Sequence, residues 1–236
     1  MPPYYPLNAT FCIDLQSLMQ DSHINDVVKI LQKELSVGAM PVVSSLAEDR
    51  RDPFVILIST LLSLRTKDEV TAAATERLFQ LAATPQEMLQ IPSAKIAEAI
   101  YPVGFYNVKA NTIHHVCREL IQRFSSKVPD NLDDLVSIKG VGRKTANLVI
   151  ALAYGKEAIC VDIHVHRISN RLGYVKTETP EKTEYALRKK LPRRYWIIYN
   201  TIMVAFGRNT CKPVSPLCSR CPVFKYCERI GVKTSR

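Results

Sequence analysis

Lys144 directly follows a Gly-Val-Gly-Arg sequence, a position where an amine could act as a nucleophile. Gly140 and Gly142 predict a tight turn, because glycine adopts positive φ angles at little cost. Apolar residues at helical spacing on both sides predict a helix, this turn and a second helix ending near Gly155. Lys144 would then lie in the first turn of the second helix beside Arg143, where the helix dipole and the adjacent charge favour a neutral, nucleophilic amine. The alternative is an ordinary solvated lysine.

The same hairpin is a candidate anion site. The first turn of its second helix would point free backbone N–H groups outward at the positive end of the helix dipole. Phosphate groups bind in this arrangement. Gly-Arg-Lys-Thr does not match a P-loop, because the contiguous Gly-Lys-Thr and the upstream strand are missing. We interpret the turn as a contact for a nucleic-acid phosphate, with a simple helical turn as the alternative.

Four cysteines form a second constellation near the end of the sequence. They are Cys211, Cys218, Cys221 and Cys227, spaced Cys-x6-Cys-x2-Cys-x5-Cys. Four thiolates in one short segment can hold a metal centre, and only one close pair is present where a zinc ribbon usually has two. An iron–sulfur cluster, which is wider than a single ion, suits staggered thiolates. The remaining cysteines are expected to be buried thiols: Cys12, Cys117 and Cys160.

The charge balance predicts an anionic partner. The chain of 236 residues has a formal net charge of +10 and a pI near 9.3. Nucleic acid is a better candidate than a membrane, because no basic amphipathic helix with an aromatic face stands out. The longest apolar run, 54–64, is short and interrupted by hydroxyl residues, and the first twenty residues lack a signal-peptide layout. We therefore expect a cytoplasmic, nucleoid-associated protein without membrane contact.

The elements that would position these residues are helices. Asp52-Pro53 has the form of an N-cap with a first-turn proline, and it precedes an apolar stretch that we interpret as a buried helix. Thr66-x-x-Glu69 and Thr84-x-x-Glu87 match capping boxes. Further helices are predicted over 24–35, 93–101, 108–124, 163–172, 180–191 and 195–206, the last ending at Gly207. No period-two strand is evident, which predicts an all-α chain of about ten helices.

Together, these segments resemble endonuclease III, a family of helix-hairpin-helix DNA glycosylases with a [4Fe–4S] cluster. The likeness covers roughly 24–227 and rests on the hairpin segment 135–147, the cysteine array and the segment Val161-Asp162-Ile163-His164. Residues 61–68 resemble the family's Leu-Leu-Ser-x-Gln-x-x-Asp segment, with arginine in place of glutamine. Residues 104–110 resemble its second DNA-inserting loop.

The resemblance implies a two-lobed, all-α fold. A six-helix barrel domain would span 46–156, and a discontinuous iron–sulfur cluster domain would comprise 1–45 and 157–236. A [4Fe–4S] cluster would bind the four cysteines of the array. Duplex DNA with a damaged base or an abasic site would lie across the cleft of a monomer, with Lys144 and Asp162 facing each other at its mouth.

The implied activity is base-excision repair of oxidised or ring-saturated pyrimidines, with glycosylase and abasic-site lyase steps. Lys144 would attack the sugar and form a Schiff base, and Asp162 would accept its proton or stabilise the developing charge. By the same resemblance, the residues expected to contact DNA are Arg65, Phe105, Lys109, Gly140, Gly142, Arg143 and His164.

Two other functions are compatible with parts of the pattern. A monofunctional glycosylase for mispaired adenine, thymine or uracil would have the same fold, but such relatives generally carry another residue at the position of Lys144. A non-catalytic iron–sulfur protein that binds DNA would keep the charge and the cysteines, but it would not need both Lys144 and Asp162.

Overall fold

A computed structural model describes residues 22–37, 40–49 and 51–236 of the chain, so the expectation for Cys12 lies outside the described residues. Within these ranges the structure is helical and has no strand, which confirms the predicted fold class. The α-helices are α1 (His23–Val37), α2 (Val42–Asp49), α3 (Pro53–Ser63), α4 (Asp68–Leu81), α5 (Pro85–Gln90), α6 (Ser93–Ile100), α7 (Tyr106–Phe124), α8 (Leu132–Ser137), α9 (Arg143–Tyr154), α10 (Ile163–Arg171), α11 (Pro180–Lys190) and α12 (Trp196–Asn209). Short 3-10 helices cover Arg193–Tyr195, Cys218–Arg220 and Phe224–Tyr226.

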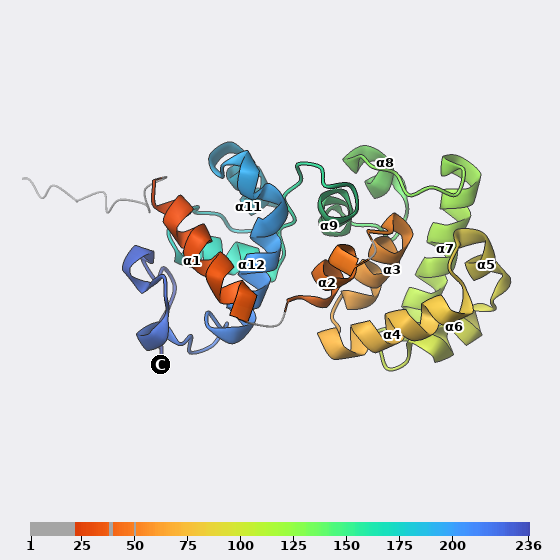
Figure 1. Cartoon of the computed structure of the whole chain (residues 1–236), viewed down its shortest axis with the longest axis horizontal. Helices are drawn as coiled ribbons and strands as arrows, with labels where there is room; N and C mark the ends of the chain where they lie inside the picture. The colour runs from red at the N-terminus through yellow and green to blue at the C-terminus, as the bar shows by residue number, and fades with distance from the viewer. Residues whose placement is uncertain (1–21, 38–39, 50) are drawn as a thin grey trace, which may run out of the picture.

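The helices gather into two lobes, each with its own hydrophobic core. Figure 1 shows α2 to α9 in one lobe and α1, α11, α12 and the C-terminus in the other. Buried side chains of the first core lie between Val43 and Cys160. Those of the second core come from α1 and from Ile159 to Val223. The chain therefore enters the second lobe, leaves it to build the first, and returns near residue 159.

Helix α1 lies against the C-terminal part of the chain although it is far away in sequence (Figure 1). The His23 ring lies 5.5 Å from the ring of Tyr226. The Asn25 side chain accepts hydrogen bonds from Arg194 Nη2 at 2.7 Å and from the Tyr195 hydroxyl at 3.1 Å. These contacts fix the first described helix to the lobe that carries the cysteine array.

Two of the predicted helix starts are confirmed. The Asp52 carboxylate accepts from the backbone N–H groups of Phe54 and Val55, so α3 begins as the Asp-Pro sequence predicts and is buried over most of its length. Thr84 and Glu87 form the complete capping box at the start of α5. Each such cap contributes about 1 kcal/mol, because it pairs amides that the helix leaves unbonded.

Two other predictions of helix ends are wrong. Helix α4 is preceded by Lys67 at the N-cap, and no side chain caps it, so Thr66 forms no capping box. Gly207 does not end α12, which continues to Asn209. A Cβ atom at position 207 would lie 2.4 Å from Nδ1 of His164, so this glycine allows close packing between helices. The local sequence does not show this contact, because His164 is distant from Gly207 along the chain.

Candidate functional site

The hairpin between α8 and α9 has the predicted form, but its two glycines differ. Gly140 has a φ of +99°, and a Cβ atom there would lie 2.5 Å from Cγ2 of Thr112 on α7. Gly142 has a φ of −82° and open space around its α-carbon. Only Gly140 therefore needs the conformational freedom of glycine, and the expectation of two such positions is wrong for Gly142. Gly142 is the exposed N-cap of α9, and no side chain caps the first turn.

Lys144 occupies the first turn of α9 and is partly exposed. Among the described residues, no carboxylate forms a salt bridge with it. Its neighbour Arg143 instead forms a two-pronged ion pair, in which Nε and Nη2 donate to the Glu184 carboxylate at 2.9 Å each. The guanidinium of Arg143 also lies 5.1 Å from the centre of the Tyr185 ring. Arg143 is thus held against α11, while the amine of Lys144 is left available.

Asp162 is the N-cap of α10, as the sequence predicts. Its Oδ1 atom accepts from the backbone N–H groups of His164 and Val165, each at 2.9 Å. In the described part of the chain, the second carboxylate oxygen has no hydrogen-bond partner, and the side chain is partly exposed. One oxygen therefore anchors the residue, and the other remains free to accept a proton or to face a positive charge.

Lys144 and Asp162 act on the same buried thiol. Burial raises the pKa of Cys160 to about 12, with Lys144 lowering it and the carboxylates of Asp162 and Glu184 raising it. Cys160 is fully buried in the segment that leads to α10. Cys160 packs in the first core and its chain neighbours on both sides pack in the second, so the charges of Lys144 and Asp162 both reach a thiol at the junction of the two cores.

His164 is half-buried beside this pair. Burial lowers the pKa of its imidazole, the Asp162 carboxylate raises it, and the positive charges of Arg167, Arg208 and Lys144 lower it. Its Nδ1 atom lies 3.1 Å from Nη2 of Arg167. The ring is therefore positioned by α10 itself, which leaves Nε2 as the atom that could meet a phosphate.

Arg65 and Phe105 form an exposed pair in the first lobe. The Arg65 guanidinium lies 5.6 Å from the centre of the Phe105 ring, and 61% of Phe105 is exposed. Both residues have left-handed backbone conformations, with φ of 54° and 59°. Such conformations cost about 1 kcal/mol or more for residues with a side chain, and they concentrate at functional sites. An exposed phenylalanine on a strained loop fits the role of a wedge.

Lys109, which the resemblance places among the DNA contacts, has a buried side chain in this structure. Only 9% of it is exposed, and its ammonium group donates to Leu62 O at 2.7 Å, Leu64 O at 2.5 Å and Thr66 Oγ1 at 3.2 Å. Burial lowers its pKa to about 8. The sequence carries a signal for this burial, because Lys109 shares a helical face with Ile113. That position indicates an interior lysine.

Glu184 is a site residue that the sequence analysis missed. It is 3% exposed and accepts from Arg143 and from Arg188 Nε at 2.9 Å. Arg188 also donates to the Asn147 side chain on α9 at 3.1 Å. A buried carboxylate needs such partners, since an unpaired charge in the interior is costly. The sequence does indicate that Glu184 is buried, because its helical spacing from Leu187 places both residues on the same buried face of α11.

The four cysteines of the array are free thiols that line one pocket of the second lobe. Burial, with a smaller contribution from the other three thiols, raises the pKa of Cys221 to about 11 against the lowering effect of a backbone hydrogen bond at Val223. Arg171 donates to Cys211 Sγ at 3.4 Å and supplies positive charge beside the thiols. No group of three or more ligand side chains among the described residues is arranged around a single ion. The four thiols that line this pocket are the type of ligand that holds an iron–sulfur cluster.

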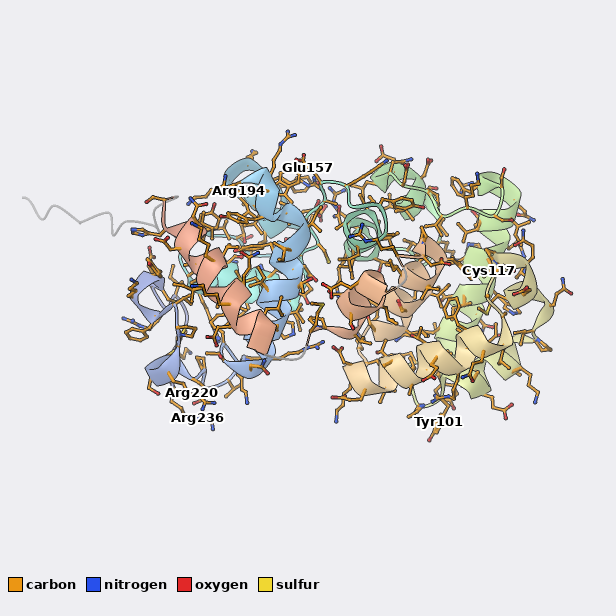
Figure 2. All side chains as sticks on the ribbon, viewed as in Figure 1. Tyr101, Cys117, Glu157, Arg194, Arg220 and Arg236 are labelled. Carbon is orange, nitrogen blue, oxygen red and sulfur yellow. The ribbon has the colours of Figure 1, made fainter. Side chains whose placement is uncertain are left out.

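Arginines in and after the cysteine segment lie along the same edge of the view as part of the first lobe. Figure 2 shows Arg220 and Arg236 along the same edge of the view as Tyr101, which precedes the Phe105 loop. The Arg236 carbonyl accepts from the Ser219 backbone N–H at 3.0 Å, so the last residues cover the cysteine segment. None of the helices in the described ranges has the length and apolar character needed to cross a bilayer.

The known proteins that this chain resembles in sequence and in structure belong to the same class of DNA repair proteins. The family model of the HhH-GPD superfamily of base excision DNA repair proteins matches residues 58–193. Endonuclease III of Thermotoga maritima is 49% identical over 177 residues, which are 75% of this chain and 83% of the relative. A trapped covalent endonuclease III–DNA intermediate has a TM-score of 0.79 at 34% identity, over 89% of this chain and 96% of that one. A thermostable thymine-DNA glycosylase has a TM-score of 0.68 at 25% identity, over 86% and 97%.

Proposed function

Because the chain belongs to the HhH-GPD superfamily of base excision DNA repair proteins, and within it to the endonuclease III family, we propose that it is a DNA glycosylase with abasic-site lyase activity. The observation that carries the proposal is the pair at the meeting point of the lobes. Lys144 there has a free amine in the first turn of α9, and Asp162 has one unbonded carboxylate oxygen.

The reaction begins on a nucleotide turned out of the duplex, because the glycosidic carbon is hidden in a stacked base. The neutral amine of Lys144 attacks C1′ of the sugar, and the bond to the base breaks with its electron pair leaving on the base. Asp162 accepts the proton that the amine loses and stabilises positive charge on the sugar. The nitrogen lone pair then forms a C=N bond as the C1′–O4′ bond breaks and O4′ takes up a proton. The resulting iminium makes the C2′ proton acidic. Loss of that proton expels the 3′ phosphate and nicks the strand.

The residues around this pair provide the DNA contacts. The uncapped first turn of α9, which follows Gly142, presents backbone N–H groups to a phosphate next to the lesion. Phe105 and Arg65 are exposed and stacked, so they fill the space that the extruded nucleotide leaves. The net charge of +10 favours duplex DNA through phosphate contacts, so affinity falls steeply as salt rises.

Oxidised or ring-saturated pyrimidines are the proposed substrates. The test is a set of duplexes with one defined lesion each, in which base release and strand nicking are followed separately. We expect the protein to release a ring-saturated pyrimidine and to nick the same strand at the same rate as it releases the base. Release of a mispaired adenine, thymine or uracil without nicking would instead show a monofunctional glycosylase, and DNA binding with neither product would show a non-catalytic protein.

We propose that the four cysteines hold a [4Fe–4S] cluster in the discontinuous second lobe, formed by α1 and by the chain from about Ile159 onward. The barrel lobe begins with α2 rather than at residue 46, because Val43 packs in the first core. When bound, the cluster supplies a structural cross-link rather than a chemical step. Four ligands from one irregular segment would bring the basic residues of that segment to a fixed position against the DNA backbone.

Cys218→Ser is expected to lower the iron content of the purified protein and to make the segment 211–227 sensitive to protease. The physical reason is that this segment has only short 3-10 turns and needs its cross-link. Iron analysis and limited proteolysis provide the measurements. Cys117→Ala, which removes a buried thiol of the first lobe, is the control and should retain iron. Equal iron in both variants contradicts the assignment.

A further inference from the structure

Lys109 joins two loops that come from distant parts of the sequence. It lies near the start of α7, and its ammonium group donates to Leu62 O and Leu64 O at the C-terminal end of α3. Thr66 Oγ1 accepts from Lys109 and also from the backbone N–H of Gly104, each at 3.2 Å. One buried cation therefore connects the loop after α3 with the loop before α7.

These are the loops that carry the exposed pair. Arg65 lies between Leu64 and Thr66, two of the acceptors of the ammonium group, and Phe105 directly follows Gly104. The loops are packed so closely that a Cβ atom at position 104 would lie 2.7 Å from the Arg65 carbonyl oxygen. Both left-handed residues are thus held by a common support below the surface, while their side chains extend into solvent.

The chemistry of the contact suits an ammonium group. The last carbonyl groups of a helix are left without intrahelical partners and carry the negative end of its dipole, so a cation is favourable there. Three acceptors surround Nζ, and an ammonium group has three N–H donors. Lys109 is the buried lysine among the described residues, and no carboxylate lies within salt-bridge distance of it. Its charge is stabilised by two backbone carbonyl groups and the Thr66 hydroxyl.

We propose that Lys109 is a positioning residue that sets the two loops for insertion into DNA, and that it does not contact DNA itself. This inference rests on the proposed function, because insertion is needed only where a nucleotide must be extruded from a duplex. A positioning role predicts that the loss of Lys109 affects the two activities of the enzyme, base excision and β-elimination, to different extents. Base excision from duplex DNA needs both loops in place, whereas β-elimination at an abasic site in single-stranded DNA needs only the amine of Lys144 and its carboxylate partner.

Lys109→Met tests the proposal, because it keeps a chain of similar length and removes the charge and the donors. We expect base excision from a duplex to fall about 10- to 100-fold, because a small misplacement of the reacting groups has an effect of this size. Nicking of the abasic single strand should change less than about twofold. Fluorescence of 2-aminopurine next to the lesion, which reports extrusion directly, should rise less than with the wild type. An equal loss on both substrates would overturn the proposal.

The salt dependence of binding separates positioning from direct contact. A lysine that neutralises a phosphate contributes about one unit to the slope of log affinity against log salt concentration. The Lys109→Met slope should equal that of the wild type, and a slope lower by about one would overturn the proposal. Lys95→Met is the control, since Lys95 is exposed on α6 and pairs only with Glu98 at the surface. It should leave both activities unchanged.

Thr66→Val provides a second variant if Lys109→Met does not fold. It removes the hydroxyl that links the ammonium group to Gly104 and leaves the charge in place. The same selective loss on duplex DNA is expected. Where Lys109→Met does fold, the double variant should be no worse than Lys109→Met alone, because both changes break the same set of hydrogen bonds. A wild-type protein inactive on both DNA substrates would refute the proposed function, and the extrusion signal and the salt slope would still test the positioning role.

Discussion

Lys144→Ala is expected to eliminate the covalent adduct that borohydride traps between the protein and abasic DNA. The adduct requires an amine at the reacting carbon, and the amine of Lys144 is the one that the first turn of α9 presents without an ion-pair partner among the described residues. Excision of the damaged base and nicking should both fall by about 1,000-fold or more, since removal of a nucleophile disables the whole catalytic unit. Denaturing electrophoresis of the reduced complex provides the measurement.

The control lies in the same hairpin. Lys139→Ala removes an exposed lysine before Gly140 and leaves α9 intact. It should retain the trapped adduct, whereas Lys144→Ala should lose it and still bind DNA, because one charge out of a net +10 contributes little to affinity. An adduct of undiminished yield with Lys144→Ala would assign the nucleophile to another amine and refute the mechanism.

The helical framework of this site could be predicted because its signals are local. Asp52 and Asp162 lie directly before apolar segments at helical spacing, and in the structure each caps its helix through its own carboxylate. The turn predicted at Gly140 is confirmed, since its φ of +99° is accessible mainly to glycine. A cap or a turn involves residues a few positions apart, so its signal is contained in a short window of sequence.

The errors concern residues whose partners are distant in sequence. Thr66 has the spacing of a capping box, but its hydroxyl is recruited by Lys109 and Gly104, which are beyond the reach of any local pattern. Gly207 has the appearance of a helix end, yet it is a point of contact with His164. A sequence pattern shows which conformations a segment prefers. It does not show which tertiary contact overrides the preference.

The most informative site residues, Lys109 and Glu184, are charged groups on buried helical faces. Both could have been identified by their position, because each falls in register with apolar residues of its helix. Burying a charge costs several kcal/mol unless it is paired, so a charged residue on an apolar face indicates a tertiary partner. Here the partners are the loop of Arg65 for Lys109 and the start of α9 for Glu184. Both buried charges support segments for which we propose DNA contacts.

Asp162→Asn is expected to reduce base excision by about 100- to 10,000-fold without lowering the stability of the protein. Asparagine has nearly the same shape and is as good an N-cap as aspartate, so its side-chain oxygen can accept from His164 and Val165 as Oδ1 does now. The substitution therefore removes the negative charge and keeps the cap. Single-turnover excision on a duplex and thermal unfolding are the two measurements.

Asp162→Ala provides the matched comparison, because it removes both the charge and the cap. It should lose the same activity and, in addition, about 1 kcal/mol of the free energy of unfolding. The imidazole of His164 gives an independent readout, since the Asp162 carboxylate raises its pKa. In Asp162→Asn an NMR titration should show that pKa lower than in the wild type. Full activity in Asp162→Asn would mean that Asp162 only caps α10, and the Lys144 amine would then need a different proton acceptor.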